Sequence, residues 1–269
     1  MNNTHKVQPE RVMALARAPR LGLITDMDGT ISPLVLVPDD AEVTARSRDL
    51  LAGLQPLLTL VAVISGREVT DVRRRVGLDA LTYIGNHGLE QWHDGQVDYA
   101  PEALPYRESI EQVIAALDSL LLPGMQLEDK MVTLSIHYRR AHDPAAAEAL
   151  AAPLRTLAEA QGLAFFEGKR VFEVRPPLEI DKGTAFTRLV DEHRLDAAIF
   201  MGDDTTDADA LRAARNLRAS GVCDTLALGV ASDDTPAAVR DSADVLVQGV
   251  SGVEEFLDEL LKARRASSN

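Results

Sequence analysis

The amino-acid sequence predicts an α/β protein: a doubly wound parallel sheet with a smaller α+β domain inserted into it. Three observations lead to this prediction. Short, continuously apolar runs end in polar residues, helical patterns separate them, and the middle of the chain has a different pattern. The 269 residues, 46% of them hydrophobic and 26% charged, suffice for one large or two ordinary globular domains.

The predicted strands are apolar on both faces. Continuous apolarity, unlike alternation of apolar and polar residues, is typical of parallel strands that are buried on both sides. The strong candidates are residues 21–25, 58–64, 81–84 and 197–201, and weaker ones are 225–230 and 245–247.

Helical patterns lie between these strands, as expected of a doubly wound sheet. Apolar residues recur at helical spacing in residues 43–54, 69–76, 184–193 and 207–217. In such sheets ligands bind at the carboxyl ends of the strands. Asp26, Ser65 and Asp203 come just after predicted strands, so we expect them at that edge.

The section 104–174 is predicted to form a second domain, because helix, strand, strand is repeated twice within it. Its expected elements are a helix in 105–121, paired strands in 125–139, a helix in 143–161 capped by Asp143, and a hairpin in 164–174 that turns at Gly168-Lys169. A further hairpin is expected in 91–99, near the entry to this section. The remaining core would comprise residues 1–103 and 175–269.

The charge balance argues against two classes of partner. The formal net charge is −14, from 28 basic and 42 acidic residues. Such a surface repels nucleic acid and anionic membranes, so we expect neither as a partner, and no protein partner is indicated. A site for an anionic metabolite must therefore be locally cationic, through lysine, arginine or a metal ion.

The expected location is the cytoplasm. Cys223 is the single cysteine, which excludes an intrachain disulfide and fits a reducing compartment. Residues 1–20 lack an apolar segment typical of a signal peptide. No apolar run approaches the roughly 20 residues that span a bilayer.

Two carboxylates directly follow the first predicted strand, in Asp26-Met27-Asp28-Gly29-Thr30. The chain leaves extended geometry there and Gly29 allows a tight turn, so both acids can converge on one small volume. One carboxylate could attack phosphorus while the second handles protons. Taken alone, such a motif is more often an Asx turn or a solvated loop.

A second acidic cluster, residues 202–207, follows another predicted strand and contains Asp203, Asp204 and Asp207. Mg²⁺ prefers hard oxygen ligands, usually one or two protein carboxylates together with water and substrate phosphate. The alternative is that Asp207 opens a helix while its neighbours face solvent. Neither acidic cluster has the spacing of an EF-hand.

Two further motifs suit a phosphoryl group. The hydroxyl and backbone N–H groups of Ser65, Gly66 and Arg67, between a strand and a helix, could cradle its oxygens. Ser-Gly is also an ordinary turn pair and helix cap. Lys182 precedes a predicted helix and could neutralise phosphate, although a single lysine is most often an exposed residue with no functional role.

The ordered set of these motifs resembles the haloacid-dehalogenase-like hydrolase superfamily. Asp-x-Asp-Gly-Thr, Ser-Gly-Arg, Lys-Gly and Gly-Asp-Asp follow one another in that order. The residues within and around these motifs are similar to those of the trehalose-6-phosphate phosphatases. The matching segments, spread over residues 21–250, are 26–33, 64–67, 85–90, 173–176, 181–183 and 202–207.

The resemblance implies a Rossmann-like hydrolase core with a mobile α+β cap inserted between the second and third motifs. It implies magnesium-dependent hydrolysis of trehalose 6-phosphate to trehalose and phosphate, a step of trehalose biosynthesis, through an aspartyl-phosphate on Asp26. Asp28 would protonate the leaving sugar oxygen and then activate water.

Other site residues are also implied by the resemblance. Asp26, the backbone carbonyl of Asp28 and Asp203 would hold Mg²⁺. Ser65 and Lys182 would bind the phosphoryl oxygens. Gly66 and Arg67 would also bind the substrate. Asp204 and Asp207 would serve the outer shell of the metal or orient Lys182.

In the cap, Glu128-Asp129-Lys130 and Glu173 match positions that family members use to hydrogen-bond sugar hydroxyls. His137 and Arg139 either assist them or are exposed charges on a sheet. For His87, a structural role in its Gly-Asn-His-Gly turn is the first expectation and substrate contact the second.

Other functions were weighed against this one. Related enzymes act on sucrose phosphate or mannosyl-3-phosphoglycerate, and a glycerate carboxylate would require additional cationic groups. A phosphomutase is a further relative. A non-catalytic sugar-phosphate-binding module is disfavoured because Asp26, Asp28, Lys182 and Asp203 are all present. A fragment of a P-type pump is excluded by the lack of a membrane segment.

Overall fold

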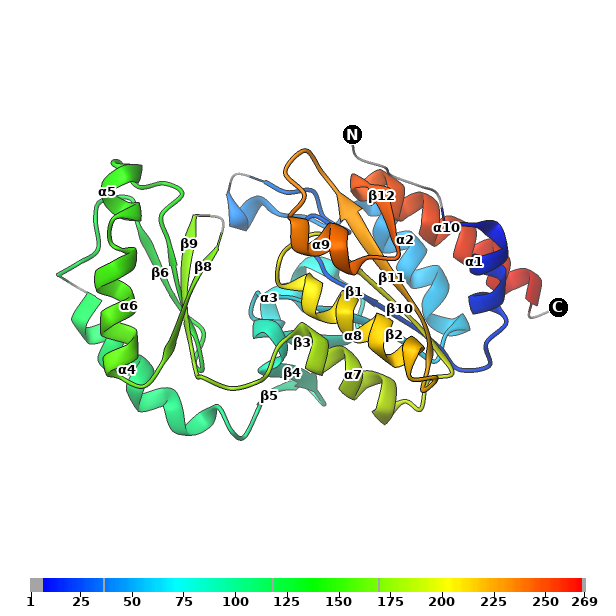
Figure 1. The fold of residues 1–269 in the computed structure, drawn as a ribbon, viewed down its shortest axis with the longest axis horizontal. Helices are drawn as coiled ribbons and strands as arrows, with labels where there is room; N and C mark the ends of the chain where they lie inside the picture. Colours follow the sequence, from blue (N-terminus) through cyan, green and yellow to red (C-terminus); the bar gives the residue numbers. More distant parts are fainter. Residues whose placement is uncertain (1–6, 36, 118, 169, 268–269) are drawn as a thin grey trace. The chain divides into compact units, whose positions relative to one another are not determined.

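The computed structural model describes residues 7–35, 37–117, 119–168 and 170–267, and the chain forms two compact units (Figure 1). The first unit combines residues 1–97 with 180–269, and the second comprises residues 98–179. The section 104–174 expected from the sequence lies inside the second unit.

The first unit is built on a mixed sheet in which, among the described residues, eight strands have the order β12-β11-β10-β1-β2-β3-β4-β5. The strands are β1 (Leu21–Thr25), β2 (Leu60–Ile64), β3 (Thr82–Gly85), β4 (Glu90–His93), β5 (Gln96–Tyr99), β10 (Ala197–Gly202), β11 (Asp224–Ala231) and β12 (Val245–Gln248). The pairs from β12 through β1 to β3 are parallel, and β4 is antiparallel to β3. The predicted α/β class with a largely parallel sheet is confirmed.

The strand order reverses at β1, in the middle of the sheet. The chain moves from β1 to β2 and β3 on one side, and later to β10, β11 and β12 on the other. Thr25, the last residue of β1, pairs with Val63 of β2 and Met201 of β10. The residues that follow these three strands therefore leave the sheet at one edge, where ligands bind in doubly wound folds.

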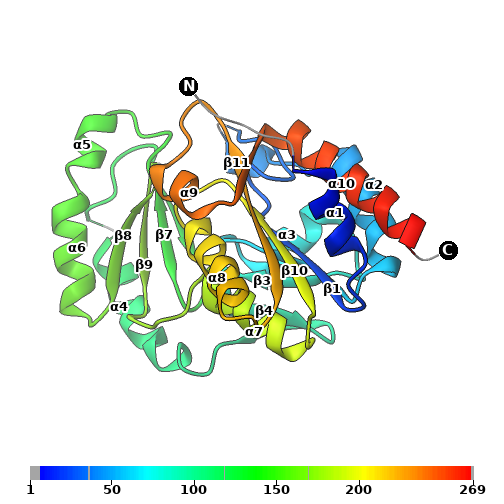
Figure 2. The ribbon, with the colours of Figure 1, turned by 45° about the vertical axis from the view of Figure 1, so that its right-hand side comes forward.

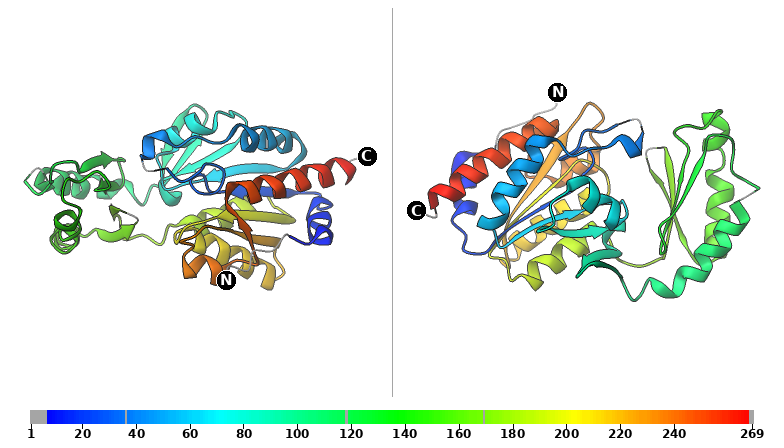
Figure 3. Two further views of the ribbon diagram at one scale, coloured as in Figure 1. Left: turned by 90° about the horizontal axis from the view of Figure 1, so that it is seen from above. Right: turned by 180° about the vertical axis from the view of Figure 1, so that it is seen from behind.

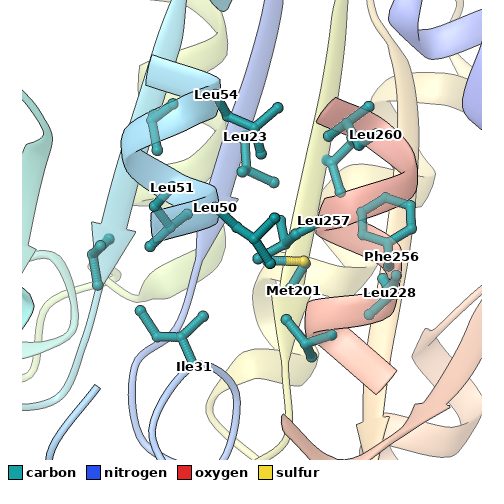
Figure 4. Close-up of a cluster of buried hydrophobic side chains, with 14 of the residues drawn as sticks. Leu23, Ile31, Leu50, Leu51, Leu54, Met201, Leu228, Phe256, Leu257 and Leu260 are labelled. Atoms are coloured by element: carbon teal, nitrogen blue, oxygen red, sulfur yellow. The ribbon is translucent and has the colours of Figure 1, made fainter. Parts of the chain in front are cut away.

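Helices cover both faces of this sheet (Figures 2 and 3). They are α1 (Pro9–Ala16), α2 (Ala45–Leu54), α3 (Val69–Val76), α7 (Lys182–Glu192), α8 (Asp207–Ala219), α9 (Ala237–Ser242) and α10 (Gly249–Ser267). Because side chains alternate along a strand, Leu23 packs with α2 and α10, whereas Ile24 packs with α7 and α8. Figure 4 shows the cluster on the side of α2 and α10, with Leu23, Leu51 and Leu257 among its members.

Three helices were missed in the sequence: α1, α9 and α10. The six residues of α9 are too few to show a helical period. At its start α10 carries Gly249 and Gly252, which are poor helix formers and masked the beginning of the pattern. Among the described helices, α10 included, none combines the length and apolarity needed to cross a bilayer.

The second unit is an antiparallel sheet with helices packed against it. Its strands, in the spatial order β6-β7-β9-β8, are β6 (Gln126–Asp129), β7 (Leu134–His137), β9 (Val171–Arg175) and β8 (Ala164–Gly168). Its helices are α4 (Arg107–Leu117), α5 (Pro144–Glu148) and α6 (Ala151–Ala160). The core centres on Phe172, whose ring stacks on Tyr138 with a centroid distance of 4.6 Å.

The helix expected over 143–161 is broken in two. Asp143 caps α5 as predicted, since its side chain accepts the N–H of Ala146 at 3.0 Å. The break at Ala149–Leu150 precedes Pro153, whose ring disfavours a continuous helix through the preceding turn. Of the predicted turn Gly168-Lys169, Lys169 lies outside the described residues.

Candidate active site

Asp26 occupies the centre of the site because it directly follows β1, the central strand. Its backbone N–H donates to the carbonyl of Met201 on β10 at 2.8 Å, which fixes the point where the chain leaves the sheet. The side chain is buried, and its Oδ1 accepts a hydrogen bond from Lys182 Nζ at 2.7 Å. Burial and the charge of Asp207 raise the pKa of Asp26 well above its usual range, although Lys182 opposes this.

Lys182 is a buried cation positioned by a helix start. In the capping box of α7, the side chain of Asp181 accepts the N–H of Thr184 at 2.8 Å, and Thr184 Oγ1 accepts the N–H of Asp181 at 2.9 Å. This cap begins α7 at Lys182, two residues earlier than expected. Burial acts to lower the pKa of Lys182, but the charges of Asp207 and Asp26 outweigh it, so the pKa is raised and the ammonium stays charged.

Asp207 orients its neighbours and has both oxygens engaged. Oδ1 accepts from Lys182 Nζ at 2.6 Å, and Oδ2 accepts the backbone N–H groups of Asp203 and Asp204 at 3.0 Å each. A Cβ on Gly202 would lie 2.4 Å from Asp207 Cγ, so only glycine allows this side chain to fold back. The side chain of Asp204 itself is exposed.

Asp203 supplies the oxygen that suits a metal ion. Carboxylate oxygens of Asp26, Asp203 and Asp207 all lie within 4.8 Å of one another. Oδ1 of Asp203 is buried and, within the described part of the chain, accepts no hydrogen bond. Burial and the charge of Asp26 raise the pKa of Asp203 to about 9. Three carboxylates around one lysine leave excess negative charge, and hard oxygens with an orphaned acceptor fit a divalent cation such as Mg²⁺.

Gly29 makes room for Asp203. Its φ of 79° lies in the left-handed region, and a Cβ there would lie 2.1 Å from Asp203 Oδ2. The tight turn predicted after the two acids therefore also brings the two acidic clusters together.

Asp28 faces an arginine. Arg67 donates from Nε to Asp28 Oδ2 at 2.6 Å and from Nη2 to Oδ1 at 3.0 Å, which is a bidentate ion pair. Burial acts to lower the pKa of Arg67, but Asp28 and Asp71 raise it well above its ordinary value. The sequence had indicated Arg67 for the substrate, whereas in the structure its guanidinium bonds this carboxylate.

Ser65 and Gly66 lie at the same sheet edge, after β2. Ser65 is buried, and its Oγ accepts the N–H of Arg67 at 3.2 Å. His87 donates its backbone N–H to the carbonyl of Ser65 at 2.9 Å, and its ring packs on Gly66, where a Cβ would lie 2.5 Å from Cε1. His87 thus has a structural contact with the predicted phosphoryl-binding turn.

Glu90 was not identified as a site residue from the sequence. It is buried, accepts the N–H of Val69 at the start of α3 at 2.8 Å, and accepts from Asn86 Nδ2 at 3.2 Å. It therefore caps the helix that follows the Ser-Gly-Arg turn, in place of a local cap. A buried acid cannot be recognised from its type alone, so the sequence carried no clear signal.

In the second unit, three of the predicted sugar-binding residues, Glu128, Lys130 and Glu173, share one face of the sheet, opposite its core. The strand register aligns Glu128 with Ser135 and Ser135 with Glu173, so these side chains point to one side. We call this the polar sheet face, formed by Glu128, Lys130, Ser135, His137, Glu173 and Arg175.

Ion pairs connect the members of the polar sheet face. Glu128 Oε2 lies 2.8 Å from His137 Nε2 and 3.7 Å from the buried Lys130 Nζ, and Glu173 pairs with Arg175. His137 thus joins the predicted set. Asp129 points to the other face and pairs with Arg107 at 2.6 Å, and Arg139 lies beyond the end of β7.

Asp71, on α3, was also missed in the sequence. Its carboxylate accepts from three arginines: Arg67 at 3.0 Å, Arg74 at 2.5 Å and Arg75 at 2.6 Å. The available signal was the spacing of Asp71 and Arg75, since residues four apart lie on one helix face.

The first unit, with its acidic cluster at the carboxyl ends of β1 and β10, has the fold of haloacid-dehalogenase-like proteins. The C-terminal domain of trehalose-6-phosphate phosphatase from C. albicans superposes with a TM-score of 0.76 at 22% identity, covering 96% of this chain and 99% of that one. Residues 24–241 match the family model described as trehalose-phosphatase. The chain belongs to this family.

Curated relatives extend the comparison. A trehalose-phosphate phosphatase from Mycobacterium marinum is 37% identical over 224 residues, which cover 76% of this chain and 55% of the relative. Trehalose-phosphate phosphatase B from Arabidopsis thaliana is 29% identical over 276 residues, covering 95% and 70%. The chain spans about half the length of the mycobacterial relative.

Proposed function

We propose that this chain is a phosphatase that hydrolyses trehalose 6-phosphate to trehalose and inorganic phosphate, with Mg²⁺ and an aspartyl-phosphate intermediate. The supporting observation is the buried carboxylate of Asp26, which lies beside Lys182 and close to Asp203, whose Oδ1 accepts no hydrogen bond from the described residues. The names of the relatives support the choice of substrate.

The first step transfers the phosphoryl group to the protein. A carboxylate oxygen of Asp26 attacks phosphorus, and the bond between phosphorus and the sugar oxygen breaks. Asp28, in its acid form, gives its proton to the leaving oxygen, so trehalose departs as an alcohol. Lys182, Ser65 and the backbone of Gly66 hold the phosphoryl oxygens and stabilise their charge.

The second step returns Asp26 to its starting state. Asp28, now a carboxylate, takes a proton from water, whose oxygen attacks phosphorus. The bond between phosphorus and the Asp26 oxygen breaks, and inorganic phosphate leaves. Asp207 keeps Lys182 directed at Asp26 through both steps, by the hydrogen bond of 2.6 Å.

The residues that would hold Mg²⁺ are Asp26, Asp203 and the backbone carbonyl of Asp28. When bound, the ion neutralises charge on the transferring phosphoryl group. Asp207 lies beyond these ligands, because both of its oxygens are already engaged. Asp204 contributes its backbone N–H to Asp207 rather than a buried side chain.

Glu128, Lys130 and Glu173 are proposed to bind the sugar hydroxyls. All three belong to the polar sheet face of the second unit, where charged groups form strong hydrogen bonds to hydroxyls. Gly66 and Arg67 remain candidates for contact with the phosphoryl end of the substrate. A cytoplasmic location stays a prediction.

The proposal is tested by phosphate release from trehalose 6-phosphate, glucose 6-phosphate, sucrose 6-phosphate and mannosyl-3-phosphoglycerate, each with Mg²⁺ and with EDTA. We expect magnesium-dependent turnover of trehalose 6-phosphate and much slower release from the others. Preference for another substrate would retain the chemistry and overturn the assignment of the sugar. No turnover of any substrate would contradict the proposed activity and favour a sugar-phosphate-binding module.

A further inference from the structure

We propose that Asp71 is a positioning residue for the reaction: through Arg67 it holds the carboxylate of Asp28 in place, and through Arg75 it ties that carboxylate to the loop after the first motif. This inference rests on the proposed role of Asp28 as the proton carrier. It assigns a task to a side chain outside the predicted site.

The contacts form a continuous chain of charges. Asp71, in the first turn of α3, accepts on Oδ2 from Arg67 Nη1 at 3.0 Å. The other edge of the same guanidinium, Nε and Nη2, donates to both oxygens of Asp28 at 2.6 and 3.0 Å. The Arg67 side chain is only 17% exposed, so these hydrogen bonds are largely shielded from water.

Arg75 extends the chain to the loop between β1 and α2. It donates from Nε to Asp71 Oδ2 at 2.6 Å, and from Nη1 to the backbone carbonyls of Asp39 and Ala41 at 2.9 and 2.6 Å. Its side chain is 6% exposed. Asp28 begins this loop, so its carboxylate and the backbone further along are held by one carboxylate, that of Asp71.

The geometry allows Asp71 to affect proton transfer through the position of Arg67. A guanidinium is a planar fork, and two carboxylates on different edges fix both its position and its rotation. Because Arg67 donates to both oxygens of Asp28, the position of its guanidinium determines where that carboxyl group lies. Without Asp71, Arg67 would lose the hydrogen bond at Nη1, and a misplacement of about 1 Å can cost about a hundredfold in rate.

Two classes of phosphate ester separate this role from a general effect on the fold. A sugar alkoxide is a poor leaving group that requires protonation, whereas the 4-nitrophenolate of 4-nitrophenyl phosphate leaves without it. The ratio kcat/KM covers events up to the first irreversible step, which includes leaving-group departure. A residue that acts through Asp28 therefore affects the sugar substrate far more than the nitrophenyl substrate.

The experiment measures kcat/KM of Asp71→Asn on trehalose 6-phosphate and on 4-nitrophenyl phosphate, with Mg²⁺. We expect a loss of about 10- to 100-fold on the sugar phosphate and of less than about threefold on the nitrophenyl ester. Asp79→Asn is the matched control, since Asp79 pairs with Arg73 at 2.5 Å but is 88% exposed and lies past the end of α3. It should leave both values unchanged.

Arg67→Lys is a second variant, because lysine keeps the charge but cannot bond both carboxylates as a planar fork. It should show the same preference for the activated ester, and it decides the question if Asp71→Asn does not fold. Equal losses on both substrates, as expected if Arg67 binds the phosphoryl group that both share, would overturn the proposal, as would no loss on either. Inactive wild-type protein would instead contradict the proposed function.

Discussion

The active-site cluster and the polar sheet face are both rich in charge, but they balance it differently. In the cluster, the buried carboxylates of Asp26 and Asp207 and the half-buried carboxylate of Asp203 surround the ammonium of Lys182. One carboxylate oxygen, Oδ1 of Asp203, has no hydrogen bond among the described residues.

On the polar sheet face each acid has a basic partner. Glu128 lies 2.8 Å from His137, and Glu173 pairs with Arg175. The side chains of Glu128 and His137 are partly exposed, so water shares in their solvation. The antiparallel register supplies the pairing, because it places residues of neighbouring strands side by side.

The difference indicates that the two regions have different functions. A buried excess of negative charge is costly unless a cation enters, so the cluster suits a metal ion followed by a phosphoryl group. A paired and partly hydrated face is already stable and can exchange hydrogen bonds with neutral hydroxyls. We therefore expect chemistry to depend on the cluster and substrate affinity on the polar sheet face.

The largest effect should come from Asp26→Asn. An amide of nearly the same shape cannot form the aspartyl-phosphate, so phosphate release should fall by at least about 10⁴-fold. The measurement is the initial rate with trehalose 6-phosphate and Mg²⁺. Asp224→Asn, which removes a charge paired with Arg11 at 2.6 Å, is the control and should retain full activity. Activity of Asp26→Asn above a few per cent would contradict the hypothesis that chemistry depends on the active-site cluster.

Removal of the metal should destabilise the first unit. Mg²⁺ is expected to bind the folded protein and not the unfolded chain, so at a hundred times its Kd it should stabilise the fold by about 2.7 kcal/mol relative to protein treated with EDTA. Thermal unfolding with and without Mg²⁺ measures this. Asp203→Asn should lose the shift. Asp209→Asn, on the first turn of α8 and paired with Arg212, should keep it. An equal Mg²⁺ shift in both variants would contradict the ligand assignment.

A smaller effect is expected on the polar sheet face. Glu173→Gln preserves shape but weakens hydrogen bonds to sugar hydroxyls, so KM for trehalose 6-phosphate should rise about tenfold. Both kinetic constants for 4-nitrophenyl phosphate should stay within about twofold. Glu167→Gln is the control, because Glu167 is exposed and pairs with Arg155 at 2.7 Å. A loss confined to kcat would show that this face takes part in chemistry. It would contradict the expectation that the polar sheet face determines substrate affinity.

The sequence was sufficient for the fold class and for the sheet edge that carries the cluster. Continuous apolar runs identified β1, β2, β3 and β10, and Asp26 and Asp203, which follow β1 and β10, do lie close together. What it could not supply was contact between distant segments. The bond between Lys182 and Asp26 joins residues 156 positions apart, and no local pattern encodes it.

Some local features of the structure also could not be predicted from the sequence. The start of α10 was hidden by two glycines, and the break between α5 and α6 depends on how Pro153 fits the preceding turn. The pairing of Arg67 with Asp28 requires the turn after β2 to face the turn after β1. A residue type and a spacing cannot distinguish this from contact with a phosphoryl group.

The smallest effect concerns stability and separates Asp71 from Asp79, two aspartates that both bind arginine. Burial acts to raise the pKa of Asp71, but hydrogen bonds from Arg75 and Arg74 prevail and lower it. A carboxylate with a lowered pKa in the folded state stabilises the fold above its unfolded pKa, about 3.9, and this contribution disappears as the pH falls below that value.

Asp71→Asn should therefore lower the free energy of unfolding by about 1 kcal/mol at pH 7, and the difference from wild type should shrink as the pH falls below about 4. Asp79→Asn should change it less, since Asp79 is 88% exposed. Urea unfolding at pH 7 and near pH 3 measures both. A deficit for Asp71→Asn that is constant with pH would mean that the ionised carboxylate does not hold the arginines, and the link from Asp71 to Asp28 would fail with it.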